Sequence, residues 1–174
     1  MPIWPFRRSR AGEDAERLLA AVTAASRRSV MFGAGRLPDT LEGRFELMAL
    51  NGALALIRLR QEPVLAPLAQ AFVDRLFRQF DAGLREDGVG DTSVPKRMHK
   101  LAGEFYGRAE AYGAAITQGD SEALASAISR NALRAEAHPF APALARYALA
   151  VAQNQGGGPV GALFGADGWP AAAG

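Results

Sequence analysis

Apolar residues recur at steps of three and four along most of the chain, the spacing that places them on one face of an α-helix. Residues 41–61 show this spacing twice: Phe45 and Met48 belong to one apolar face, and Leu47 and Leu50 belong to a second. A helix that is apolar on two faces lies at the centre of its fold. Because no stretch of useful length alternates apolar and polar residues as a strand does, the pattern predicts an all-α protein.

Turn and cap residues divide the pattern into separate helices. Pro63 and Pro95 suit the first turn of a helix, where a missing N–H does no harm. Asp39 and Glu42 have the spacing of a capping box, and His138 precedes a proline, which pushes it out of the helical region. We expect helices over residues 13–30, 39–61, 63–86, 95–118, 121–137 and 140–153. The sequence therefore predicts a single domain, an irregular bundle of about six helices.

Both ends of the chain differ in composition from this helical region. The beginning contains two prolines and three arginines, and the end is rich in glycine, alanine and proline. Neither composition is typical of a segment that folds alone. We divide the chain into a basic flexible leader (1–12), a helical domain (13–154) and a flexible tail (155–174).

The leader has two interpretations. Trp4, Phe6 and Arg7 would suit a membrane interface, where aromatic rings and basic groups both find partners. Alternatively, the leader is a disordered basic segment without such a contact. It has no apolar core of the kind that a secretory signal contains, so we expect a cytoplasmic protein.

Composition excludes several classes of protein. Of 174 residues, 49% are hydrophobic and 22% are charged, which is ordinary for a globular chain. The absence of cysteine excludes disulfides and thiolate metal sites. The longest apolar stretch, residues 47–57, is interrupted by Asn51 and is well short of the roughly 20 residues that cross a bilayer. We interpret this stretch as a buried core helix.

The residue types that carry catalysis are sparse. Of the two histidines, His99 lies among basic residues and is expected on the surface, whereas His138 is expected to serve as a cap or turn residue. The Gly88–Gly90 sequence follows a helix and lacks the lysine of a phosphate-binding loop, so we interpret it as a turn with positive φ angles. Carboxylates and histidines do not recur at metal-ligand spacing. We therefore expect a protein that is not an enzyme and that has no cofactor or metal.

Charged and aromatic residues are densest between residues 80 and 112. Lys96, Arg97 and Arg108 would share one helix with Lys100, a basic face of the kind that meets nucleic acid. Acidic residues such as Glu104 interrupt this face, and no helix-turn-helix or zinc module accompanies it. We expect no specific DNA binding.

Several residues in this region resemble the signature of the ubiquinol-cytochrome c chaperone family. They are Arg85–Asp91, Val94–Lys96, Phe105–Arg108 and Tyr112, with Arg130–Asn131 in a later helix. The resemblance extends over about residues 41–153. It implies a non-enzymatic assembly factor for the cytochrome bc1 complex, respiratory complex III, that binds newly made cytochrome b or another bc1 subunit.

The family's mitochondrial members act with a small helper protein near the ribosome. The resemblance therefore implies the helper protein and the ribosome as further partners. This chain resembles the shorter bacterial type, which lacks the targeting and membrane region of those members. The resemblance therefore also implies a place at the cytoplasmic face of the inner membrane.

The candidate client-binding residues are Arg85, Asp91, Lys96, Arg97, Tyr106 and Arg108. Charged residues at a corner between two helices can meet a client, or they can brace the corner through ion pairs, and the sequence leaves both interpretations open. Gly103 and Gly107 are expected to allow another backbone to approach their helix. A second hypothesis for the whole chain is a helical interaction or regulatory domain whose basic face binds ribosome, RNA or another protein.

Overall fold

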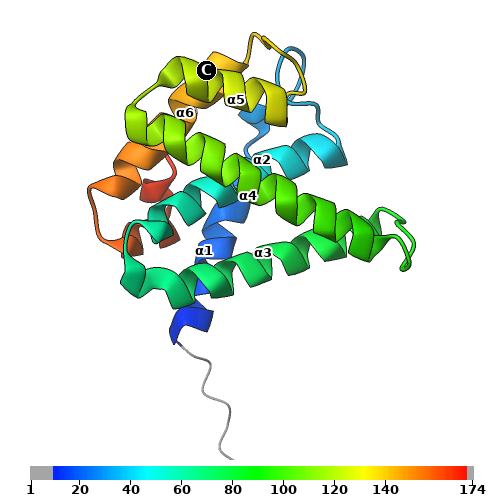
Figure 1. The fold of residues 1–174 in the computed structure, drawn as a ribbon, viewed down its shortest axis with the longest axis horizontal. Coiled ribbons are helices and arrows are strands. Elements are labelled where there is room, and N and C mark those ends of the chain that lie inside the picture. Colours follow the sequence, from blue (N-terminus) through cyan, green and yellow to red (C-terminus); the bar gives the residue numbers. More distant parts are fainter. Residues whose placement is uncertain (1–9, 172–174) are drawn as a thin grey trace, which may run out of the picture.

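A computed structural model describes residues 10–171, which excludes Trp4, Phe6 and Arg7 of the leader. The described residues form six α-helices and four short 3-10 helices, and the predicted all-α class is confirmed (Figure 1). The elements are α1 (Arg10–Ser26), η1 (Ser29–Met31), α2 (Leu41–Arg60), η2 (Pro63–Leu65), α3 (Ala66–Glu86), α4 (Val94–Gln118), α5 (Ser121–Ala132), α6 (Ala141–Gly156), η3 (Val160–Phe164) and η4 (Ala166–Gly168).

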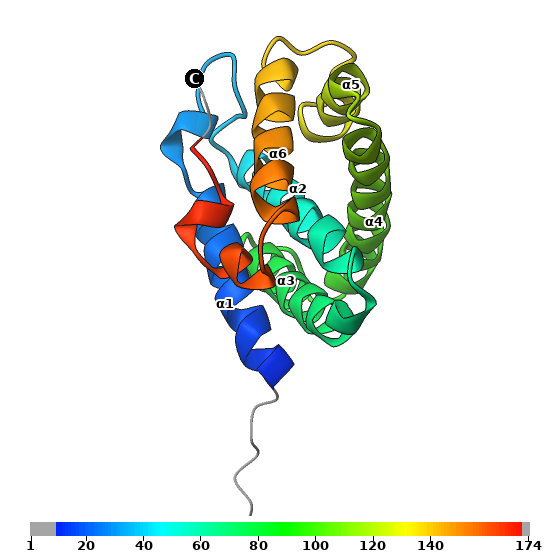
Figure 2. The ribbon, with the colours of Figure 1, turned by 90° about the vertical axis from the view of Figure 1, so that its left-hand side faces the viewer.

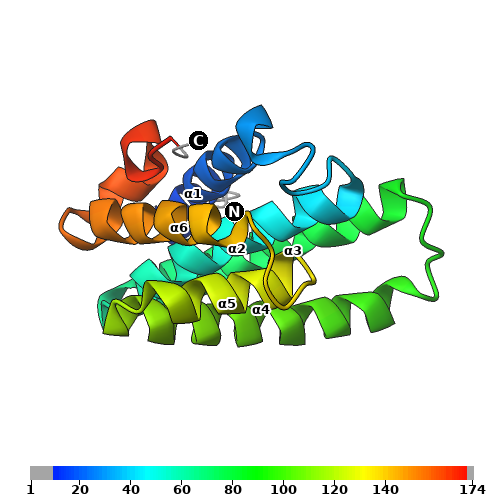
Figure 3. The same ribbon diagram turned by 90° about the horizontal axis from the view of Figure 1, so that it is seen from above.

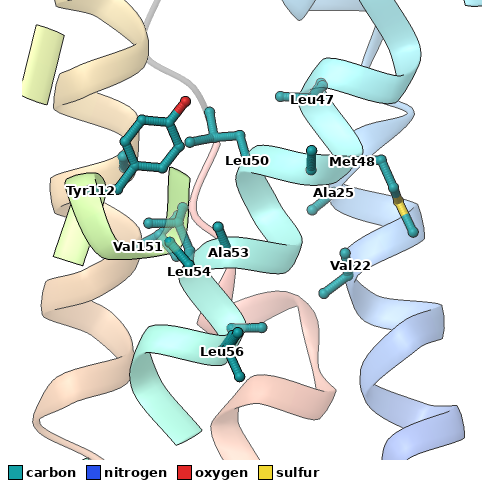
Figure 4. Close-up of a cluster of buried hydrophobic side chains, with 14 of the residues drawn as sticks. Val22, Ala25, Leu47, Met48, Leu50, Ala53, Leu54, Leu56, Tyr112 and Val151 are labelled. Carbon is teal, nitrogen blue, oxygen red and sulfur yellow. The ribbon is translucent and has the colours of Figure 1, made fainter. Parts of the chain in front are cut away.

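Helix α2 is the centre of the fold. It contacts all five other α-helices and lies between α1 on one side and α4 on the other (Figure 3). Its residues 46–56 are buried without interruption, which confirms the prediction of a helix that is apolar on two faces. Figure 4 shows Leu47, Leu50 and Leu54 of α2 among side chains from its neighbours, including Val22 of α1 and Val151 of α6. Burial of this kind is the main stabilising term of a small domain.

Two buried polar residues of α2 tie it to distant parts of the chain. Asn51 donates to Ser26 Oγ of α1 at 3.0 Å and accepts from Tyr147 Oη of α6 at 2.9 Å. Burial raises the pKa of Tyr147 to about 12, so its hydroxyl stays protonated and keeps donating. Arg58 Nε donates to the carbonyl of Gln155 at 2.8 Å. These contacts fix which face of α2 each neighbouring helix meets, because a buried polar group without a partner is costly.

Helix α2 begins with a different cap from the one predicted. Thr40 is the N-cap residue, and its Oγ1 accepts from the backbone N–H of Gly43 at 3.1 Å. Asp39 instead pairs with Arg44 Nε at 2.9 Å on the surface. The capping box of Asp39 and Glu42 was therefore wrong by one residue, because threonine competes for the same N–H groups.

Helix α5 ends at Ala132, five residues earlier than predicted. The side chain of Ser129 accounts for the difference: its hydroxyl donates to the carbonyl of Ala135 and accepts from the N–H of His138, both at 2.8 Å. Arg134 has a φ of +52°, which ends helical geometry at this point. His138 lies in the resulting turn, as predicted.

The described part of the tail, residues 155–171, differs from the flexible segment expected from its composition. It folds back beside α1 and α6 (Figure 2). Trp169 is 2% exposed, and its indole N–H donates to the carbonyl of Leu163 at 3.1 Å. Arg28, which directly precedes η1, donates to the carbonyl of Trp169. The tail therefore covers part of the core that the six helices leave open.

The glycines of α4 do not have the role expected of them. A Cβ added at Gly103 or Gly107 would meet no atom within 4 Å, so the expected close approach of another backbone at these positions is wrong. Glycine is required instead at Gly43, where a Cβ would lie 1.9 Å from the carbonyl oxygen of Pro38, and at Gly168, where it would lie 2.3 Å from that of Ala162. Among residues 10–171, no helix combines the length and apolarity that crossing a membrane would need.

Candidate interaction surfaces

Residues 87–93 connect α3 to α4 and project from one end of the molecule (Figure 1). The turn closes through a bond from the N–H of Val89 to the carbonyl of Leu84 at 3.0 Å. Gly88 has a φ of +84°, a conformation that favours glycine, so the predicted turn is confirmed at this residue. Val94 is 1% exposed and anchors the start of α4 in the core. Leu84, near the end of α3, is also buried, so an apolar anchor on each side holds the charged residues of this corner in place.

Arg85 and Asp91 form an ion pair across this corner. Arg85 also pairs with Asp81 through Nε at 2.7 Å, and this hydrogen bond, together with the charge of Asp81, raises the pKa of the guanidinium. The Arg85 side chain is 45% exposed and that of Asp91 is 87% exposed. Exposed ion pairs contribute little to stability. These residues therefore link α3 to the connection with little effect on stability, and they remain accessible to a partner.

Lys96 and Arg97 lie in the first turns of α4, beside the same corner, and both side chains are exposed. Within residues 10–171, no carboxylate lies within ion-pair distance of either side chain. Their charges are therefore available to an acidic surface, and Arg85, Asp91, Lys96 and Arg97 form one corner surface.

The structure places Arg108 in the interior, away from the other candidate residues. Its side chain is 6% exposed and its Nη2 lies 3.1 Å from a carboxylate oxygen of Glu46, which is itself buried. The same nitrogen donates to the carbonyl of Asn131 in α5 at 3.2 Å. Arg108 therefore joins α4 to α2 and α5, and its charge is not presented to a client.

Glu46 is the acidic centre of this buried cluster. Burial raises the pKa of its carboxyl, while the charges of Arg108 and Arg134 act in the opposite direction. Arg134 reaches Glu46 at 3.3 Å from the α5–α6 connection, although its own side chain is 70% exposed. The cluster therefore links three helices and the connection that follows α5.

Tyr106 lies on a different surface from the corner. It is 39% exposed, and its ring meets that of Phe77 edge to face, with 6.0 Å between the centroids. It lines a groove of about 410 Å³, here called the Tyr106 groove. The groove is lined by Leu56, Leu59, Arg60, Glu62, Pro63, Ala66, Ala69, Gln70, Val73 and Tyr106.

A second, wider groove of about 820 Å³ opens between α1, the start of α2 and the end of α3. We call it the α1–α3 groove, and it adjoins the corner surface through Glu86. Phe32, Leu41, Phe45, Met48 and Phe80 are among its apolar lining residues, and Arg27, Asp39, Arg44 and Glu86 are its charged ones. The fold therefore offers two hollows with apolar lining to a partner.

Several residues of these surfaces and of the buried cluster were not selected from the sequence. Glu46 could have been, because a charged residue in a helix that is apolar on two faces has no solvent face to occupy. Nothing in the sequence near Arg60 or Val64 pointed to a binding site. Their possible role in binding depends on Tyr106 of α4, which the fold brings near the end of α2. In the described part of the chain, no three His, Asp or Glu side chains gather as metal ligands would.

Comparison with known proteins identifies the class to which this fold and these surfaces belong. The sequence model of the ubiquinol-cytochrome c chaperone family matches residues 34–155, and the chain belongs to this family. The chain is also similar to the crystal structure of the Cbp3 homolog from Brucella abortus, with 41% sequence identity and a TM-score of 0.79. That similarity covers 91% of this chain and 89% of the other. A comparison with curated protein sequences found no match.

The family match has a consequence for the three surfaces. Residues 34–155 include the whole corner surface and every residue that lines the Tyr106 groove. The α1–α3 groove, in contrast, takes part of its lining from Thr23 to Gly33, before the matched residues begin.

Proposed function

We propose that the protein is a non-enzymatic assembly chaperone of the cytochrome bc1 complex, which binds newly made or unassembled cytochrome b or another bc1 subunit. Its membership of the ubiquinol-cytochrome c chaperone family supports the assembly role. The structural observation that carries the binding role is the Tyr106 groove, with its apolar lining and the 39% exposed ring of Tyr106, within the matched residues. Exposed apolar residues beside a hollow are typical of sites that bind other proteins.

An unassembled membrane subunit presents apolar segments that would aggregate in water. A chaperone for such a subunit needs apolar contact area together with charged residues that keep its own surface hydrated. The corner surface supplies these charges, and Lys96 and Arg97 suit acidic loops of the client or an anionic membrane surface. We therefore place the protein at the cytoplasmic face of the membrane, where both partners would be met.

The second hypothesis, a domain whose basic face binds ribosome, RNA or another protein, is supported by the exposed side chains of Lys96 and Arg97. The basic face is smaller in the structure than in the sequence, because Arg108 is buried and Lys100 lies 3.8 Å from Glu104. Binding to ribosomes that weakens steeply with salt would favour this hypothesis.

Deleting the gene for this chain tests the proposed assembly role. We expect the amount of assembled bc1 complex and of spectroscopically detected cytochrome b to fall, because unassembled cytochrome b is left without its chaperone. An independent respiratory complex should keep its normal level, and a plasmid copy of the gene should restore bc1. Normal bc1 activity and normal cytochrome b in the deletion strain would contradict the proposal.

A further inference from the structure

The Tyr106 groove has an apolar floor with space above it. Leu56, Leu59 and Val73 are buried and come from the end of α2 and the first half of α3. Ala66 and Ala69 line the same groove, and their small side chains leave room for larger groups from a partner. The volume of about 410 Å³ lies within the range of about 300–1,000 Å³ that is common for binding sites.

The apolar surface continues beyond the groove. Val64 is 79% exposed and lies in η2, directly next to the lining residue Pro63. Val64 is not a lining residue, but it is one residue from Pro63 and two from Ala66, which both line the groove, so its exposed side chain is the apolar group we expect at the groove margin. A partner that fills the groove would also cover this margin.

One positive charge at the groove has no carboxylate partner among the described residues. The guanidinium of Arg60 lies over the ring of Tyr106, 5.7 Å from its centroid, which holds it beside the groove. Glu62, the acidic lining residue, already pairs with Arg58 at 2.7 Å. The groove therefore presents an apolar surface with one net positive charge that is not neutralised.

We propose that the Tyr106 groove binds an apolar helical segment of the client that carries a carboxylate, with the carboxylate paired to Arg60. This rests on the proposed function, and it adds the binding site and the chemistry of the bound segment. An apolar helix that lies in a groove uses side chains on one face as anchors, and a charge at the edge fixes its direction. The α1–α3 groove fits this chemistry less well: Arg44 pairs with Asp39, and the two charged lining residues that remain, Arg27 and Glu86, have opposite signs.

Two synthetic amphipathic peptides test the proposal with the full chain. Both are leucine- and alanine-rich helices, identical except for a glutamate or a lysine at the border of the apolar face. We expect the glutamate peptide to bind about tenfold more tightly in fluorescence anisotropy, because only its carboxylate can pair with Arg60. Arg60→Glu should reverse this preference, and Val64→Asp should weaken the glutamate peptide by about tenfold through charge repulsion and lost apolar contact.

Matched controls come from exposed residues elsewhere. Leu41→Asp places the same charge at the margin of the α1–α3 groove, where Leu41 is 38% exposed, and Arg146→Glu reverses an exposed charge on α6. Both controls should bind the glutamate peptide as the wild type does. Unchanged circular dichroism of all four variants would show that the fold is kept.

Several results would overturn the proposal. They are equal affinity of the wild type for the two peptides, no reversal in Arg60→Glu, or a loss in Leu41→Asp equal to that in Val64→Asp. Binding to phosphatidylglycerol vesicles without binding to either peptide would assign the groove to lipid instead, and loss of self-association in Val64→Asp would assign it to a second copy. Because the peptides contain no bc1 subunit, this result is independent of bc1 assembly in the deletion strain, so failure here and failure of the proposed function are distinguishable.

Discussion

Replacing Arg108 with methionine is expected to lower the free energy of unfolding by about 3–5 kcal/mol at pH 7. Arg108 and Glu46 are both buried, with 3.1 Å between Nη2 of Arg108 and a carboxylate oxygen of Glu46. Removing the guanidinium leaves a buried carboxylate whose remaining partner is the mostly exposed Arg134. It also leaves the carbonyl of Asn131 without its donor. Urea unfolding followed by circular dichroism measures the loss.

The loss should depend on pH in a defined direction. Burial raises the pKa of Glu46, Glu104 adds to the rise, and Arg108 and Arg134 oppose it. Without Arg108 the pKa of Glu46 rises further, so above its ordinary value of 4.5 the folded variant holds a proton that the unfolded chain releases. When the pKa of a carboxyl is higher in the folded than in the unfolded chain, its contribution to stability is fully present below the unfolded pKa. The contribution is lost as the pH rises through the folded pKa. The variant should therefore be closer to the wild type at about pH 5 than at about pH 7.

Two further variants separate this effect from a general loss of packing. Adding Glu46→Leu to Arg108→Met should recover much of the stability and remove the extra pH dependence, because the uncompensated buried charge is gone. Asp39→Ala breaks the exposed Asp39–Arg44 pair and should cost no more than about 1 kcal/mol. A double variant that loses the sum of its two single losses would contradict the account of this cluster.

Replacing Trp169 with alanine is expected to cost about 3–5 kcal/mol, although it lies within six residues of the end of the chain. The indole is 2% exposed and makes the bond to Leu163, and the neighbouring Gly168 accepts from Gln155 Nε2 at 3.0 Å. The loss combines a cavity beside the last helix with an orphaned carbonyl. Thermal or urea unfolding of the full-length chain measures it.

The exposed side chain of Asp167 provides a control in the same segment. Asp167→Ala should change the free energy of unfolding by no more than about 0.5 kcal/mol, because the bond from Asn154 goes to the backbone carbonyl of residue 167. If Trp169→Ala proved as stable as Asp167→Ala, the packing of the tail on α1 and α6 would not hold in solution.

The helices could be predicted from the sequence because their signals are local. Apolar spacing, first-turn prolines and cap residues act within a few positions, and α3 and α4 end where these signals predicted. The early end of α5 depends on Ser129, whose hydroxyl holds residues six and nine positions further on. A serine within a helical pattern gives no sign of such a contact, so the boundary was missed.

The tail and the buried cluster could not be predicted, because both depend on contacts between distant residues. Composition described residues 155–174 correctly as rich in glycine, alanine and proline, yet Trp169 finds a site that only the folded α1 and α6 create. Arg108 looked like a surface cation, and its partner Glu46 lies 62 positions earlier. Arg108 therefore serves the fold, whereas Tyr106, two positions earlier, is partly exposed.

The corner was predicted as a group, and the structure keeps Arg85, Asp91, Lys96 and Arg97 together on one exposed surface. The sequence did not separate Tyr106 from this corner, because both belong to one dense stretch of charged and aromatic residues. Helix α4 places them on different surfaces, since Tyr106 lies several turns from the connection that precedes Val94. Client binding remains a prediction, both for the corner surface and for the Tyr106 groove.

Affinity capture with chemical crosslinking from membranes tests whether the protein binds an unassembled bc1 subunit. An affinity-tagged copy of the chain, expressed at its normal level, is crosslinked in cells and recovered after detergent extraction, with an untagged strain as the control. We expect cytochrome b, or another bc1 subunit, to be crosslinked to the tagged chain in excess over the other subunits of the complex. Recovery of no bc1 subunit, or of all of them in the proportions of the assembled complex, would contradict this proposal.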